Sequence, residues 1–148
     1  MTGPMDEREI DAMLHTGSVA HLACVLPDGR PYVVPVTYAF DGRALFVYTA
    51  DGLKLHALRE NPQVCLVVDD IIDAATWRSI VAWGHVRELH GAAAADALRR
   101  ISDRLQTVAL ASHAPSAAEH SYVARTAPYG VAYRIDIDEL TGRSYSDG

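Results

Sequence analysis

Residues 30–68 read RPYVVPVTYAFDGRALFVYTADGLKLHALRENPQVCLVV, and this stretch decides the fold. It contains the β-rich runs YVVPVTYAF and ALFVYTA, separated by Asp41-Gly42, and the run SVAHLACVL precedes it across Asp28-Gly29. Asp-Gly between β-rich runs indicates a hairpin, because glycine adopts positive φ without steric cost. The sequence therefore predicts three consecutive antiparallel strands. Pro35 lies within the middle run and predicts an edge or bulge there, because proline cannot donate to a strand ladder. A ladder broken at that point could serve a ligand.

The same stretch continues into a short helix and a further strand. Residues 51–61 predict a helix capped by Asp51 and stopped by Pro62. QVCLVVDD at 63–70 is mostly apolar, which indicates a strand buried on both faces. A polar turn holding Asp69, Asp70 and Asp73 then leads into TWRSIVAWGHVREL at 76–89, a long strand with a kink or bulge expected at Gly84.

Helical patterns flank this sheet on both sides in the sequence. Residues 5–15 predict a short amphipathic helix, and Leu98, Ile101 and Leu105 recur at helical spacing after Gly91. Residues 107–128 show no clean period and predict a loop, whereas PYGVAYRIDIDEL at 128–140 alternates as a half-exposed strand does. About six strands with helices between them predict a mainly β fold with α elements, a closed six-stranded antiparallel barrel with flanking helices. With no repeat or linker, residues 1–148 are expected to form one domain.

Composition excludes several classes of function. Hydrophobic residues make up 49% of the 148 residues, charged residues 22%, and the formal net charge is −6. No basic face is indicated, so nucleic acid is not an expected partner. The N-terminus lacks the pattern of a signal peptide and no apolar run is long enough to span a membrane, so we expect a cytoplasmic protein. Cys24 and Cys65 lie in apolar runs and are expected to be free, buried thiols.

Familiar catalytic and metal-binding motifs are absent. The chain contains no dinucleotide-binding glycine motif, phosphate-binding loop, H-E-x-x-H sequence or G-x-S-x-G elbow. Its seven histidines are scattered and show no ligand spacing, so no metal site is predicted.

The run at 30–68, followed by WRSIVAWGHVREL at 77–89, resembles the pyridoxamine 5′-phosphate oxidase-like FMN-binding split-barrel superfamily, in particular its nitroimidazole-resistance branch. In the second block an arginine precedes a glycine by six residues, as Arg78 precedes Gly84 here. The resemblance covers residues 5–90 well and 131–142 loosely. It implies a six-stranded split barrel and a homodimer with two FMN molecules at the subunit interface.

Carried over by position, the resemblance also implies a set of site residues. One segment would run along the flavin ring and offer backbone groups to its polar edge: Val34, Pro35, Val36, Thr37 and Tyr38. Thr49 and Lys54 would hold the phosphate, while Arg78 and Ser79 would add contacts from the partner subunit. A phosphate dianion favours a hydroxyl, helix N-terminal amides and a cation, which Thr49 and Lys54 bring together at the start of a helix. Lys54 is the only lysine among thirteen basic residues.

The implied activity is FMN-dependent electron transfer from a reduced nicotinamide to a small organic acceptor, with the flavin supplying the chemistry. Tyr48 is a candidate proton donor or substrate-facing group. Nitroimidazole-resistance relatives tend to carry histidine where Tyr48 stands, which argues against nitroreduction. The chain ends TGRSYSDG without the paired basic residues of true pyridoxamine phosphate oxidases, which argues against that substrate. The alternatives are a split barrel binding a deazaflavin coenzyme or haem, and a dimer that holds a flavin or another nucleotide without turnover.

Overall fold

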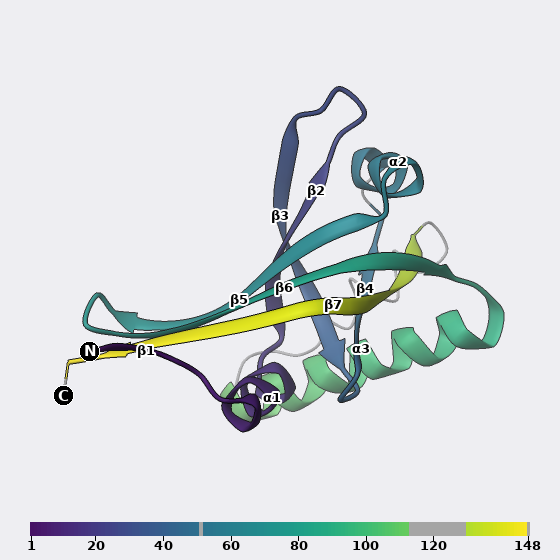
Figure 1. Ribbon diagram of the computed structural model, residues 1–148. Coiled ribbons are helices and arrows are strands. Elements are labelled where there is room, and N and C mark those ends of the chain that lie inside the picture. The colour runs from purple at the N-terminus through teal and green to yellow at the C-terminus, as the bar shows by residue number, and fades with distance from the viewer. Residues whose placement is uncertain (51, 113–129, 148) are drawn as a thin grey trace.

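The computed structural model describes residues 1–50, 52–112 and 130–147, which form seven strands and three helices (Figure 1). The strands are β1 (Thr2–Pro4), β2 (Val19–Val25), β3 (Pro31–Phe40), β4 (Ala44–Thr49), β5 (Gln63–Asp73), β6 (Thr76–Leu89) and β7 (Val131–Ser146). The helices are α1 (Glu7–Thr16), α2 (Gly52–Glu60) and α3 (Gly91–Ser112).

The strands form a closed antiparallel barrel, as predicted. The sheet order is β1-β7-β4-β3-β2-β5-β6, and β6 also pairs with β7, so six strands close on themselves and β1 adds to the far end of β7. Both predicted Asp-Gly hairpins are present, with Gly29 and Gly42 at φ of 88° and 97°. Closure pairs the outer strands of an apolar sheet with each other and removes the edges that would otherwise invite aggregation.

The bulge predicted at Gly84 is also confirmed. The register between β6 and β7 shifts between Trp83 and Gly84, and a Cβ atom at Gly84 would collide with the carbonyl oxygen of Asp136. Glycine is therefore required for the close approach of the two strands, and the bulge bends the longest pair in the barrel.

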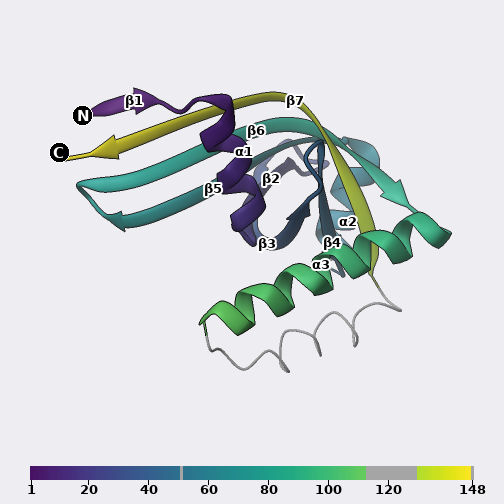
Figure 2. The ribbon, with the colours of Figure 1, turned by 90° about the horizontal axis from the view of Figure 1, so that it is seen from below.

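β4 contributes side chains both to the barrel core and to the contact with α3. All six of its residues are buried: Leu45 and Val47 point into the barrel core, whereas Phe46 lies in a second apolar cluster together with Ile101 of α3. Figure 2 shows α3 running along this side of the molecule, next to β3 and β4. A strand buried on both faces needs a continuous apolar run, which is the pattern of ALFVYT.

Beyond the barrel, β5, β6 and β7 continue as a long ribbon that β1 joins (Figure 1). The stacked rings of Trp77 and Tyr145, with centroids 6.2 Å apart, lie on this ribbon. Asp69 and Asp70 belong to β5 rather than to a polar turn, because the hairpin turns only at residues 74–75.

Three further sequence expectations are corrected, and one is confirmed in part. Residues 64–68 of β5 alternate between buried and half-buried, and Gln63 is exposed, so QVCLVV is not buried on both faces. Pro35 lies at an open edge of β3, one of the two predicted alternatives, because β4 pairs with β3 only over Tyr38–Phe40; no register shift occurs there, so the bulge alternative is wrong. α3 runs on to Ser112 where a loop was expected from residue 107, although residues 113–129 lie outside the described part. β7 extends to Ser146, and β1 was not predicted, because three residues carry too little periodicity to register as a strand.

Candidate functional site

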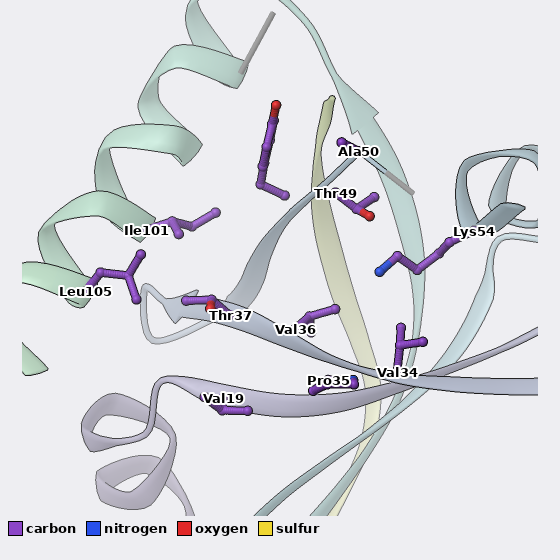
Figure 3. Close-up of a pocket in the computed structure, with 11 residues that line it drawn as sticks. Val19, Val34, Pro35, Val36, Thr37, Thr49, Ala50, Lys54, Ile101 and Leu105 are labelled. Carbon is purple, nitrogen blue, oxygen red and sulfur yellow. The ribbon is translucent and has the colours of Figure 1, made fainter. Parts of the chain in front are cut away.

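A cavity of about 600 Å³ opens between β3, β4, α2 and α3 (Figure 3). It falls within the size range of small-molecule and cofactor sites. Eleven residues line it: Val19, Val34, Pro35, Val36, Thr37, Tyr48, Thr49, Ala50, Lys54, Ile101 and Leu105. Seven of the ten residues predicted for the cofactor site are among them. The cavity therefore brings together the predicted β3 segment and the predicted phosphate pair.

The edge of β3 is open toward this cavity because β4 leaves it early. The backbone N–H of Tyr38 donates to the carbonyl of Ser18 at 2.9 Å, so antiparallel alternation turns the backbone groups of Val36 and Val34 toward β2 as well. Those of Pro35 and Thr37 point to the opposite side. There, β4 pairs with β3 only over Tyr38–Phe40. Pro35 has no N–H group to lose on that side, which explains how a proline fits inside a strand without a bulge.

Lys54 and Thr49 form the polar end of the cavity. Thr49 is the last residue of β4 and Lys54 lies in the first turn of α2, and each is only 4% exposed. Figure 3 shows both side chains directed into the cavity from its α2 side. Burying an ammonium group is costly unless charge or hydrogen bonds compensate for it. A buried lysine beside a hydroxyl at the wall of a cavity is therefore a donor set suited to an anion.

The opposite end of the cavity is apolar and comes from α3. Ile101 and Leu105, 1% and 8% exposed, reach the cavity from one face of that helix and also pack in the cluster around Phe46. The helical spacing of Ile101 and Leu105 in the sequence predicts an amphipathic helix whose apolar side is buried, and both residues are buried. The spacing does not show that the same side chains also form the wall of a cavity.

Tyr48 lines the cavity and is fixed by a close contact with the backbone. A Cβ atom at Gly130 would collide with the Tyr48 hydroxyl, so only glycine permits the ring to lie where it does. Tyr48 is 8% exposed. Its hydroxyl thus packs against Gly130, directly before β7.

Tyr38 lies in the barrel core and does not line the cavity. It is fully buried, and its hydroxyl donates to the carbonyl of Leu14 at 2.8 Å, which anchors the last turn of α1. Burial raises the pKa of Tyr38 to about 12, and the nearby Arg104 opposes that shift only in part. Since its backbone N–H is bonded to Ser18, Tyr38 contributes to the site by holding β3 in register.

Arg78 and Ser79 lie apart from Lys54 within one protomer. Arg78 lines a second cavity, of about 380 Å³, between the end of α1 and the β5–β6 ribbon, and its guanidinium pairs with Asp70 at 2.7 Å. Ser79 lies opposite Asp69 on β5 and Arg143 on β7. Val19 lines both cavities. The structure of one chain therefore does not join these two residues to the phosphate pair.

No three His, Cys, Asp or Glu side chains come together as metal ligands anywhere in residues 1–50, 52–112 and 130–147. Over the same residues, no helix combines the length and the apolar character needed to cross a bilayer.

A closed six-stranded split barrel with a cavity at the open edge of β3 defines the class of this protein. Residues 6–144 match the family model described as pyridoxamine 5′-phosphate oxidase, and the chain belongs to that family. Its solved relatives include an FAD-binding protein from Mesorhizobium loti, with 28% identity, a TM-score of 0.70 and coverage of 99% of this chain and 98% of that one.

Two further proteins are similar to this chain, one in structure and one in sequence. HutZ, the haem storage protein of Vibrio cholerae, has a TM-score of 0.73 over 95% of this chain and 96% of its own, but at 13% identity it shows the fold alone. An uncharacterized protein of Rhizobium meliloti is 35% identical over 85 residues, which is 57% of this chain. The match spans 56% of the length of that relative. The fold thus has both flavin-binding and haem-binding representatives among its neighbours.

Proposed function

We propose that this protein binds FMN in the cavity between β3, β4, α2 and α3, and uses it to pass electrons from a reduced nicotinamide to a small organic acceptor. The observation that carries the proposal is Lys54, a residue only 4% exposed that lies with Thr49 at one end of a largely apolar cavity. The FAD-binding relative from Mesorhizobium loti, which matches nearly the whole of both chains, supports a flavin as the ligand.

The residues that line the cavity match the phosphate and the ring system of a flavin nucleotide. Lys54 and Thr49 would hold the phosphate, since a cation and a hydroxyl give charge-assisted and neutral hydrogen bonds to its oxygens. The apolar side chains of Val34 and Val36 would pack on the ring system. The backbone groups of Pro35 and Thr37, which face away from β2, would meet the polar edge of the ring.

A bound flavin would supply the redox chemistry, accepting a hydride and releasing two electrons. The chain would bind the phosphate, orient the ring along β3 and exclude water with the apolar wall of α3. Tyr48 would hold a proton on its Oη at a position fixed by Gly130, where it could be donated to a reduced acceptor.

We further propose a homodimer in which Arg78 and Ser79 complete the cofactor site of the partner. Two rows of residues cross the outer face of β3, β2, β5 and β6: Val33, Ala23, Cys65 and Trp83, and next to them Pro35, His21, Val67 and Val81. Val33 and Trp83 are 62% and 42% exposed. This face is largely apolar and adjoins the cavity through Pro35, so a second copy covering it would reach the flavin.

Haem fits the cavity less well than a flavin does. Haem iron needs an axial ligand such as His, Cys, Met or Tyr. Tyr48 is the only one of these residue types among the eleven lining residues. A buried lysine and an open strand edge, in contrast, match the phosphate and the ring of a flavin.

The visible spectrum of the purified protein tests the ligand. We expect a yellow protein with flavin bands, from which heat or acid releases FMN on chromatography. Release of FAD would show that the bound nucleotide is FAD and not FMN. A Soret band, a deazaflavin, or a colourless protein that does not bind added FMN would contradict the proposal. Anaerobic mixing with NADH or NADPH should then bleach the flavin. If the flavin stays oxidised with both donors, the protein binds flavin but does not oxidise NADH or NADPH.

Light scattering tests the dimer. Val33→Glu places a charge on the proposed interface and should yield a monomer that retains flavin poorly. Ile72→Glu changes an equally apolar and more exposed residue, 73% exposed near the tip of the β5–β6 ribbon, and should leave the dimer intact. A wild-type chain that is monomeric at micromolar concentration would refute this part of the proposal.

A further inference from the structure

The two ends of the cavity differ in charge. Lys54 and Thr49 are at the α2 end, Ile101 and Leu105 are at the α3 end, and Val36 of β3 lies between them (Figure 3). Among the eleven lining residues, Lys54 carries the only charged side chain. The α3 end therefore offers a ligand apolar contacts and the hydroxyl groups of Thr37 and Tyr48.

If the phosphate of FMN is held at Lys54 and by Arg78 of the partner subunit, the only cation among the eleven described lining residues is already matched. A second anion brought to the α3 end would lose hydration without gaining a counter-charge, which is unfavourable. An uncharged ring would lose little hydration and would pack against Ile101 and Leu105. The α3 wall thus favours a neutral ligand because it offers apolar contacts, and it disfavours an anionic ligand because it offers no counter-charge.

We infer that the electron acceptor is an uncharged, flat ring compound such as a quinone, bound against the α3 wall formed by Ile101 and Leu105. This inference rests on the proposed function. The overall reaction balances as NAD(P)H plus quinone plus one proton giving NAD(P)⁺ plus hydroquinone. The nicotinamide is oxidised by two electrons, the quinone is reduced by two, and its two oxygens take up the hydride-derived proton and the added proton.

A matched pair of ligands tests the charge preference with the wild-type protein. The methyl ester and the free acid of 1,4-naphthoquinone-6-carboxylic acid share one ring system, and the carboxyl group is remote from the quinone oxygens. Calorimetric titration of the oxidised, FMN-loaded protein at pH 7.5 should give a dissociation constant at least tenfold lower for the ester. Equal constants, or tighter binding of the acid, would overturn the inference.

A pair of leucines on α3 tests the location. Leu105 and Leu98 both pack in the cluster around Phe46, but only Leu105 lines the cavity. Leu105→Ala should weaken ester binding by about three- to tenfold through lost apolar contact, whereas Leu98→Ala should leave it unchanged. Equal effects of the two substitutions, measured on protein shown to be folded and FMN-loaded, would mean that the ester does not lie on this wall.

Failure of the inference can be told apart from failure of the proposed function. Flavin content and its anaerobic reduction by NAD(P)H are read before any quinone is added, and they test the proposed function alone. If the nicotinamide does not reduce the flavin, dithionite can, and reoxidation by ester and acid still compares the acceptors. A flavin that is bound and reducible but does not reoxidise faster with the ester than with the acid would refute the inference alone.

Discussion

Lys54 and Arg78 are two cations that the sequence assigns to one site, and the structure gives them opposite surroundings. Lys54 is 4% exposed and lines the largely apolar cavity of β3, β4, α2 and α3. The Arg78 side chain is 47% exposed on the β5–β6 ribbon and pairs with the half-exposed carboxylate of Asp70. The comparison separates a buried cation at the wall of a cavity from an exposed cation that pairs with a carboxylate.

The difference follows from desolvation. An exposed ion pair such as Arg78–Asp70 contributes about 0–1 kcal/mol, because water and salt screen both charges. A buried ammonium has already lost most of its hydration, so an anion that meets it gains a strong interaction at little further cost. Substitutions at the two positions should therefore change flavin affinity by different amounts.

The largest effect is expected for Lys54→Ala. Loss of a charge-assisted hydrogen bond to the phosphate should weaken FMN binding by about 1.5–3 kcal/mol, roughly ten- to a hundredfold. Fluorescence titration of the apoprotein with FMN measures it. Arg59→Ala is the matched control, because Arg59 is on the same helix but faces outward and pairs with Glu88 at 3.1 Å, and it should leave affinity unchanged. Equal affinity of the Lys54→Ala variant and the wild type would remove the phosphate assignment.

Gly130→Ala should have the next largest effect, on the wall between the two ends of the site. The added Cβ would displace the Tyr48 ring, and such overpacking costs about 1–2 kcal/mol of unfolding free energy. Tyr48→Phe in the same background removes the hydroxyl but leaves the ring carbon Cζ and the carbonyl oxygen of Thr49 in collision with the new Cβ, so it should restore only part of the loss. Denaturant titration of the three variants provides the measurement, and a Gly130→Ala protein as stable as the wild type would show that Tyr48 is free to move.

A smaller effect is expected for Arg78→Ala. If Arg78 reaches the phosphate of the partner, its removal should weaken FMN binding by about 1 kcal/mol, roughly fivefold, because the exposed guanidinium is screened. Asp70→Ala frees the same guanidinium and should not weaken FMN binding. If neither substitution changes the affinity for FMN, Arg78 acts only in its ion pair with Asp70. Lys54 would then be the only one of the two cations that contributes to FMN binding.

The smallest effects concern two buried tyrosines. Tyr38 donates to Leu14, whereas the hydroxyl of Tyr133 has no hydrogen-bond partner among the described residues. Tyr38→Phe should cost about 1 kcal/mol of unfolding free energy, and Tyr133→Phe should be neutral or slightly stabilising. Thermal or denaturant unfolding of both variants decides this. A greater loss from Tyr133→Phe would reveal a partner for its hydroxyl.

The same tyrosines predict a dependence on alkaline pH. Burial raises the pKa of both Tyr38 and Tyr133 from 10.0 to about 12, so the folded state holds these protons more tightly than the unfolded state does. Their contribution to stability is therefore complete below pH 10 and is lost as the pH rises from 10 to 12. Unfolding free energies across that interval should fall less steeply in the double Tyr→Phe variant than in the wild type.

The barrel was predictable because its signals are local. Hairpins at Gly29 and Gly42, the bulge at Gly84 and the all-apolar run of β4 each follow from a few neighbouring residues. The resemblance predicted Thr49 and Lys54 as a pair, and the structure places both at one cavity, because β4 ends and α2 begins within a few residues of each other.

The rest of the site depends on packing between distant segments. Ile101 and Leu105 look like core residues in sequence because they are core residues, and only the position of α3 beside β4 shows that they also bound a cavity. Tyr38 lies on the same face of β3 as Val34 and Val36, but its side chain reaches into the barrel core and donates to Leu14 of α1, a contact between segments distant in sequence. Whether Arg78 joins Lys54 depends on the proposed dimer, and no pattern within one sequence records a contact between two chains.

The comparison of FMN with riboflavin tests the central claim most directly, because the two ligands share the ring and differ in the phosphate. Titration of the wild-type apoprotein should give a dissociation constant at least tenfold lower for FMN than for riboflavin, and this preference should disappear in Lys54→Ala. Equal binding of FMN and riboflavin by the wild type would contradict the assignment of Lys54 and Thr49 to a phosphate.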